Sequence, residues 1–299
     1  MFKIHMSKFK SMKLSQLGLI MLLMMVVVIS GCSSKDNSSV KLAYVAWDSE
    51  IASTNVVKEV LESKLGVTVE MLQVDAGPMW AGIADGSADA MVAAWLPGTH
   101  ASYLEKYGND IVDAGVNLDG TKTGLAVPAY MDINSIEDLN NAEVAASLDN
   151  MIIGIEPGAG IMTATEAAIE AYGLSDYTLL ESSSAAMAQE LQKAFDNNEP
   201  IVVTGWTPHW MFANMDLKYL DDPKKVYGGA EQIHTMVRKS LKDDMPDVYL
   251  FLSQFKWTAD DMAQVMVKIQ GGQSPEEAAK DWVDNNEAKV NEWITGVNL

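Results

Sequence analysis

Three tryptophans stand where apolar, strand-like runs of the sequence end. Trp95 and Trp206 each close such a run, and each is followed two residues later by a proline, so the two stretches look like copies of one design. Trp47 follows a third run. Exposed indoles at strand ends are costly, so we expect their faces to line a protected cleft. Such a cleft suits a quaternary ammonium group, which has no N–H donor and is attracted to each ring by roughly 0.5–2 kcal/mol.

The remaining tryptophans are interpreted as packing residues. They lie in helical patterns or beside the second Trp-x-Pro stretch, where a buried indole most often fills a core. These residues are Trp80, Trp210, Trp257, Trp282 and Trp293.

A second candidate element is the turn Gly158–Ile161, which precedes a helical pattern. Glycines let backbone N–H groups approach a ligand, and a helix N-terminus favours an anion. An ordinary strand–helix connection is an equally good interpretation, and the sequence lacks the Lys and Ser/Thr of a phosphate loop. His100, five residues after Trp95, could donate a hydrogen bond to a carboxylate, and a nearby carboxylate would favour its charged form. A structural role is the alternative for His100.

Other reactive side chains do not form a recognisable catalytic set. His209 and His234 lack the spacing of metal ligands, and the sequence contains no nucleophile elbow or nucleophile–base pair. The sequence therefore predicts no catalytic residue, no metal and no cofactor.

The first residues have the pattern of an export signal. A lysine-rich start precedes the apolar run Leu17–Ile29, which is too short for a membrane span. The run ends in Ile29-Ser30-Gly31-Cys32, which resembles a bacterial lipobox, and Cys32 is the only cysteine of the chain. We expect residues 1–31 to be a signal peptide, Cys32 to be lipidated, and residues 32–39 to form a polar tether that holds the protein outside the cytoplasm at the cell membrane.

Charge and length restrict the possible partners. Removal of the four signal-peptide lysines from a chain of net charge −20 leaves −24 over 268 residues. This acidic surface repels phosphate groups, which argues against a nucleic acid partner. It also disfavours a purely anionic ligand. The remaining length suits one bilobal protein, expected to be a monomer.

Strand-like and helical segments alternate along the chain, which predicts an α/β fold with ligands at the carboxyl ends of strands. The chain is expected to cross twice between two lobes, near residues 123–129 and 220–237, so that a two-stranded hinge flanks a cleft. After Asp222 the pattern predicts mainly helix. The expected lobes are 40–125 with 230–299 (lobe 1) and 126–229 (lobe 2).

The segments around these residues resemble the glycine betaine-binding proteins of bacterial ABC importers. The resemblance lies in the runs Tyr44–Glu50, Ala94–His100, Gly158–Met162 and Thr204–Trp210. It implies a two-lobe periplasmic-binding-protein-like (type II) fold, and a ligand such as glycine betaine or proline betaine that is passed to an ABC permease and its ATPase. It also implies a trimethylammonium cage of Trp47, Trp95 and Trp206, and carboxylate contacts from the amides of Gly160 and Ile161 and from His100.

Three alternatives remain open at this point. A choline or carnitine receptor would use the same indoles, although choline has no carboxylate for the turn and for His100. An extracytoplasmic enzyme acting on a methylated amine would need a catalytic set that the sequence does not display. A sensor that binds the same ligand without transport would carry the same motifs.

Overall fold

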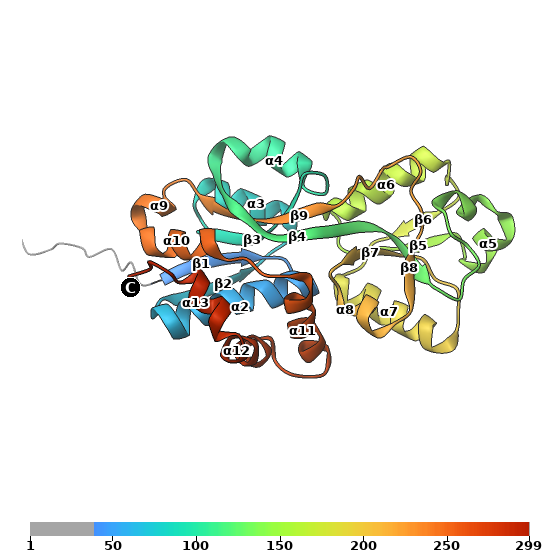
Figure 1. Cartoon of the computed structure of the whole chain (residues 1–299). Coiled ribbons are helices and arrows are strands. Elements are labelled where there is room, and N and C mark those ends of the chain that lie inside the picture. Colours follow the sequence, from blue (N-terminus) through green and yellow to red (C-terminus); the bar gives the residue numbers. More distant parts are fainter. Residues whose placement is uncertain (1–38, 299) are drawn as a thin grey trace, which may run out of the picture. The chain divides into compact units, whose positions relative to one another are not determined.

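The computed structural model describes residues 39–298, so the predicted signal peptide, Cys32 and nearly all of the tether lie outside the described residues. In the described part, eight strands follow the order β2-β1-β3-β9-β4-β7-β5-β6, and a ninth strand, β8, pairs with β4 outside this order (Figure 1). Within these residues no helix has the length and apolar character needed to cross a membrane.

The first part of the chain builds parallel strands connected by crossover helices. β1 pairs in parallel with β2 and β3, which requires helical connections such as α2 and α3. Val56, Val57, Val60 and Leu61 of α2 are fully buried, so this helix packs one apolar face against the core. The elements are β1 (Ser39–Tyr44), α2 (Asp48–Leu65), β2 (Thr68–Gln73), α3 (Ala76–Asp85), β3 (Ala90–Leu96), α4 (Ala101–Tyr107), η1 (Gly108–Asp110) and β4 (Ile111–Pro128).

The middle of the chain again alternates parallel strands with helices, and its strands are shorter. β5 pairs in parallel with β6 and β7, and β7 pairs antiparallel with β4. The predicted strands and helices of this part are present, with bounds shifted by a few residues. They are η2 (Ile136–Asn140), α5 (Ala142–Ser147), β5 (Met151–Ile153), α6 (Gly160–Tyr172), β6 (Thr178–Leu180), α7 (Ser184–Asn197), β7 (Val203–Thr207), α8 (Trp210–Asn214) and β8 (Leu217–Tyr219).

The last part returns to the first sheet before it becomes helical. The prediction of mainly helix after Asp222 is wrong for one strand, β9, which pairs antiparallel with β3 and β4. Thr258 and Ser274 form capping boxes, as expected for helix starts, and α11 and α12 pack against α2. The elements are β9 (Glu231–Arg238), α9 (Leu241–Asp244), α10 (Pro246–Gln254), α11 (Ala259–Gln270), α12 (Pro275–Asn285) and α13 (Glu287–Trp293).

β4 pairs with β9 and with β7, and so connects the two parts of the sheet. It pairs with β9 from Ile111 to Thr121 and with β7 from Lys122 to Ala126, and the chain crosses back between β8 and β9 (Figure 1). The fold therefore has two lobes and two crossings. We call the lobe built on β1, β2, β3 and β9 the first lobe, and the lobe built on β5, β6, β7 and β8 the second lobe.

Candidate functional site

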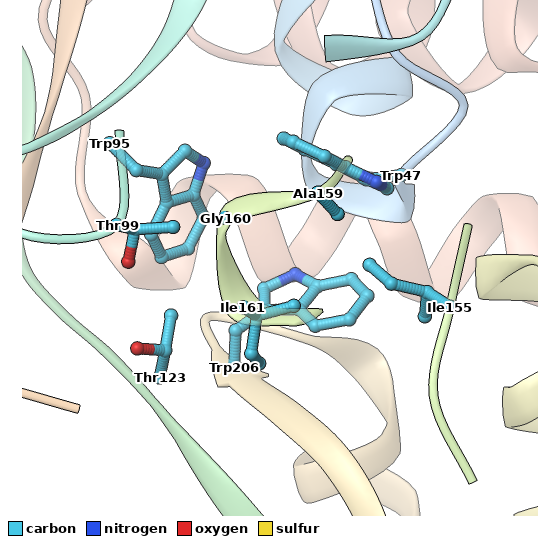
Figure 2. Close-up of a pocket in the computed structure, with 9 residues that line it drawn as sticks. All are labelled: Trp47, Trp95, Thr99, Thr123, Ile155, Ala159, Gly160, Ile161 and Trp206. Carbon is cyan, nitrogen blue, oxygen red and sulfur yellow. The ribbon is translucent and has the colours of Figure 1, made fainter. Parts of the chain in front are cut away.

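A pocket with about 290 Å³ of empty space lies where the two lobes meet. Figure 2 shows its three indoles around one space, with the turn of the second lobe between them. Trp47 occupies the N-cap position of α2, whereas Trp95 and Trp206 are each the second-last residue of a strand, β3 and β7. The pocket is lined by Trp47, Trp95, Thr99, Thr123, Ile155, Ala159, Gly160, Ile161 and Trp206.

The three indoles are almost completely removed from bulk water. Trp47, Trp95 and Trp206 are 6%, 3% and 4% exposed. Desolvation strengthens the attraction between a cation and an aromatic face, to about 2 kcal/mol or more per ring. The pocket therefore has the chemistry of a small site for an apolar, positively charged group.

Each pocket indole directs its N–H group to an oxygen of a side chain. Trp95 Nε1 donates to Glu50 Oε1 at 2.7 Å, and Trp206 Nε1 donates to Ser49 Oγ at 3.1 Å. Trp47 Nε1 donates to Glu156 Oε1, which follows β5 in the second lobe. These bonds fix the ring planes while leaving their faces free for the pocket.

Asp48, in the same turn of α2, is bound by three residues of the second lobe. Trp210 Nε1 donates to Asp48 Oδ1 at 2.9 Å and Ser184 Oγ donates to Asp48 Oδ2 at 3.2 Å, while His209 Nε2 lies 3.3 Å from Oδ2. Burial raises the pKa of Asp48, but the contact with His209 and the bonds from Trp210 and Ser184 outweigh this effect, so the pKa is lowered. The lobes are thus in direct contact next to the pocket.

The tryptophans predicted as core are buried, and most differ from the pocket indoles in their N–H partners. The Nε1 atoms of Trp80, Trp257 and Trp282 have no hydrogen-bond partner in the described part of the chain, and Trp293 Nε1 donates to a backbone carbonyl. Trp210 is also buried, as predicted, but its bond to Asp48 makes it part of the contact between lobes.

Gly160 and Ile161 begin α6 at the pocket wall. The N-cap is Ala159, whose methyl side chain cannot accept the N–H bonds of the first turn, so these donors have no capping side chain. A Cβ atom at Gly160 would collide with the backbone carbonyl of Thr99 in the first lobe. Tyr103 Oη donates to Gly158 O at 2.7 Å and holds this turn against the first lobe.

The loop that carries Thr99 and His100 is held by one buried carboxylate. Glu231, at the start of β9, accepts from Gly98 N at 2.5 Å, from Thr99 N at 2.7 Å and from Thr99 Oγ. Because Glu231 stands where the chain re-enters the first lobe, it connects the second crossing to the pocket.

His100 lies behind the pocket lining, with its ring 5.8 Å from that of Trp47. It is fully buried, and burial lowers its pKa to about 3. Because Nδ1 accepts a bond from Trp95 N at 3.1 Å, the ring is neutral with its proton on Nε2. That Nε2–H group finds no partner within residues 39–298 and is available as a donor. The charged form would require a nearby carboxylate.

Sequence reasoning missed the acidic residues that support the pocket. Glu50 stands three residues after Trp47, where an acidic residue in a first helical turn is usually solvent-exposed. Glu156 and Glu231 likewise carry no motif that sets them apart. Within the described range, no group of three or more His, Cys, Asp or Glu residues could hold a metal ion.

Comparison with known proteins relates this chain to substrate-binding proteins of transport systems. The model of a family described as the substrate binding domain of ABC-type glycine betaine transport systems matches residues 38–285. The glycine betaine/carnitine transport binding protein GbuC of Listeria monocytogenes is 55% identical over 157 residues, 52% of this chain and 52% of that protein. The match thus spans about half the length of this curated relative.

Two solved structures are similar over most of their length. Lactococcal OpuAC, in its closed-liganded conformation with glycine betaine, is 46% identical, covers 86% of this chain and 99% of its own, and has a TM-score of 0.81. An ABC-transporter choline binding protein in complex with choline is 28% identical, covers 89% and 94%, and has a TM-score of 0.82. The predicted type II periplasmic-binding-protein fold is confirmed.

We expect His100 to remain neutral well below the usual histidine range. Because its pKa is lowered to about 3, ¹⁵N NMR should find one neutral tautomer with the proton on Nε2 between pH 8 and pH 5. The unfolded chain binds a proton near pH 6.5, so the stability contributed by this residue is present above that pH and is lost as pH falls toward 3. Protonation of His100 with a midpoint near pH 6.5 in the folded protein would contradict this assignment.

Proposed function

We propose that this chain, which belongs to the family of substrate-binding domains of ABC-type glycine betaine transport systems, captures glycine betaine outside the cytoplasm and delivers it to an ABC permease and its ATPase. The observation that carries the ligand assignment is the pocket walled by three nearly buried indoles beside a helix N-terminus. Proline betaine combines the same two charged groups and is a second ligand of this class.

In this proposal the trimethylammonium group occupies the space between Trp47, Trp95 and Trp206. The ligand has no N–H donor, so aromatic faces are the chemistry that can recognise its positive end. The methyl groups gain from burial against the same rings. The acidic protein surface supports an attraction to the cationic end and selects against simple anions.

The ligand carboxylate is proposed to accept bonds from the backbone N–H groups of Gly160 and Ile161 and from His100 Nε2. A neutral histidine with an unpartnered Nε2–H group is a suitable donor, and a bound carboxylate would raise its pKa from the low value of the empty site. The cationic and anionic ends of the ligand would thus be bound by different walls of one pocket.

We propose residues 40–125 with 230–299 as lobe 1 and residues 126–229 as lobe 2, with closure around the ligand. The first lobe supplies Trp47, Trp95 and His100, and the second supplies Trp206 and the Gly160–Ile161 turn. A ligand that contacts both lobes binds the closed state better than the open state and therefore shifts the population toward it. The protein acts as a monomeric receptor and carries out no chemical reaction on its ligand.

Choline and carnitine form the second candidate ligand class. The similarity to a choline complex supports an aromatic site for either cation, and the Listeria relative is described as a glycine betaine/carnitine binding protein. Choline has no carboxylate, so the turn at Gly160 and the donor of His100 favour glycine betaine over choline.

Removal of one cage ring should weaken ligand binding strongly. We expect Trp206→Ala to raise the Kd for glycine betaine by about 30-fold or more, because a desolvated cation–π contact contributes about 2 kcal/mol. Isothermal titration calorimetry measures the change. The matched truncation Trp282→Ala, in the core, should lower the thermal midpoint and leave the Kd of the folded protein nearly unchanged. Equal losses of affinity in both variants would exclude the proposed cage.

A side chain at Gly160 should prevent closure. Gly160→Ala places a methyl group against the Thr99 carbonyl, so the Kd for glycine betaine should rise by about 10-fold or more. Small-angle scattering should then find the ligand-saturated variant more open than the wild type. Gly229→Ala is the matched control, because a Cβ there meets no atom within 4 Å. Wild-type affinity in Gly160→Ala would argue against a closed lobe contact at this turn.

The membrane anchor is tested independently of the ligand. Lipidation requires the thiol of Cys32, and its acyl chains hold the protein at the membrane. Cys32→Ser, expressed in a bacterium with a lipoprotein pathway, should move the protein from the membrane fraction to the soluble extracytoplasmic fraction. Retention of the variant in the membrane fraction would show that another segment anchors it.

A further inference from the structure

Glu50 is a buried acid at the base of the proposed cage. Its side chain is 0% exposed in the first turn of α2, although an acid at this place in a helix normally faces water. Its two oxygens have different donors, since Oε1 accepts from Trp95 Nε1 at 2.7 Å and Oε2 accepts from Ser49 Oγ. A buried carboxylate of this kind is costly unless something compensates for it.

Ser49 extends this contact to a second indole. Its Oγ donates to Glu50 and accepts from Trp206 Nε1 at 3.1 Å. Trp206 belongs to the second lobe, whereas Ser49 and Glu50 belong to the first. One carboxylate is therefore bonded to two of the three pocket rings, directly to one and through a single hydroxyl to the other. Hydrogen bonds in such a chain polarise one another, so a negative charge on Glu50 makes both ring faces more attractive to a cation.

We propose that Glu50 is the buried counter-charge of the cage, and that it makes the pocket select a cationic headgroup over a neutral group of the same shape. The inference rests on the proposed function, because it assumes that the three indoles receive the ligand. Glu50 is a positioning and specificity-determining residue in this account, since it acts through Trp95 and Trp206.

Among the described protein groups around Glu50, none carries a positive charge that would compensate its own. The neighbours of Glu50 from β3 and β7 are Trp95 and Trp206, and both side chains are neutral. On its own helix, the charged neighbour of Glu50 is Asp48. Asp48 has the same sign and is itself paired with His209 of the second lobe. Burial raises the pKa of Glu50 to about 7, against opposing effects of the bonds from Ser49 and Trp95.

Two opposite pH effects follow from this arrangement. A bound cation favours the ionised form, so affinity should be highest above pH 7 and should fall as pH drops through the pKa of Glu50. The empty protein behaves in the other direction, because a carboxyl group with a raised folded-state pKa contributes stability at low pH that is lost as pH rises toward 7. The stability effect requires only burial of the carboxyl group, so the effect on affinity is the one that identifies a counter-charge to the ligand.

The test compares glycine betaine with its uncharged-headgroup analogue 3,3-dimethylbutanoate, in which carbon replaces nitrogen. Titration calorimetry at pH 8 gives the ratio of the two Kd values for wild type and for Glu50→Gln, which keeps the shape and removes the charge. We expect the preference for glycine betaine to fall by about 10- to 100-fold in Glu50→Gln, as for loss of one buried charge that acts on the ligand through an effective dielectric constant of about 20. Glu62→Gln, an exposed acid on the same helix, should keep the wild-type ratio.

The pH dependence supplies a second measurement that needs no variant. Near pH 7, wild type should release a fraction of a proton when it binds glycine betaine, and less when it binds 3,3-dimethylbutanoate, as measured in buffers of different ionisation enthalpy. Both ligands are expected to close the same lobes, so any proton that the Asp48–His209 pair exchanges on closure should be the same for both. The difference in proton release between the two ligands therefore reports on Glu50.

The outcomes separate the two proposals. If wild type binds no quaternary amine, the proposed function fails and this inference fails with it. If wild type binds glycine betaine but Glu50→Gln weakens both ligands equally, or proton release is the same for both, Glu50 is a structural residue and the inference alone is overturned. Loss of the folded state in Glu50→Gln leaves the decision to the proton measurement on wild type.

Discussion

The pocket depends on how its three indoles are held, because each ring is fixed through the N–H group at its edge while its face stays free for the pocket. An unpaired buried donor costs about 1–3 kcal/mol, and a ring without an edge contact can also turn. Three rings facing one small space therefore require three acceptors outside that space. Here Glu50, Ser49 and Glu156 provide them, and two of these belong to one turn of α2. The position of that turn decides the shape of the pocket.

The rest of the fold positions this turn. α2 packs on β1, β3 and the helices α11 and α12, so its N-terminus is held rigidly where the parallel strands end. The same turn contacts the second lobe through Asp48, and Glu231 holds the neighbouring loop from β9. Rigid elements thus supply both the pocket walls and the contacts between lobes, while the pocket itself contains mainly faces of rings and backbone.

The sequence predicted the features that repeat or have a period. The pocket rings were predicted because Trp95 and Trp206 occupy equivalent places after apolar runs, and the α/β class was predicted because strand-like and helical segments alternate along the chain. β4 and β9 were missed because β4 is rich in Gly, Asp and Asn, and shifts of register between the two strands break the alternation of apolar and polar residues. Glu50 could not have been found from its local pattern, because its burial depends on β3 and β7, which are distant in sequence.

β4 runs through both sheets as one continuous strand, and this has a consequence for how the protein resets after release. Two lobes joined by a loose linker would have to search many mutual orientations before their faces met again, at a cost in entropy. Lobes that share a hydrogen-bonded strand retain their alignment, so the proposed closure would have far fewer mutual orientations to search. Repeated cycles of capture and delivery then begin from the same geometry each time, with no need to rebuild it.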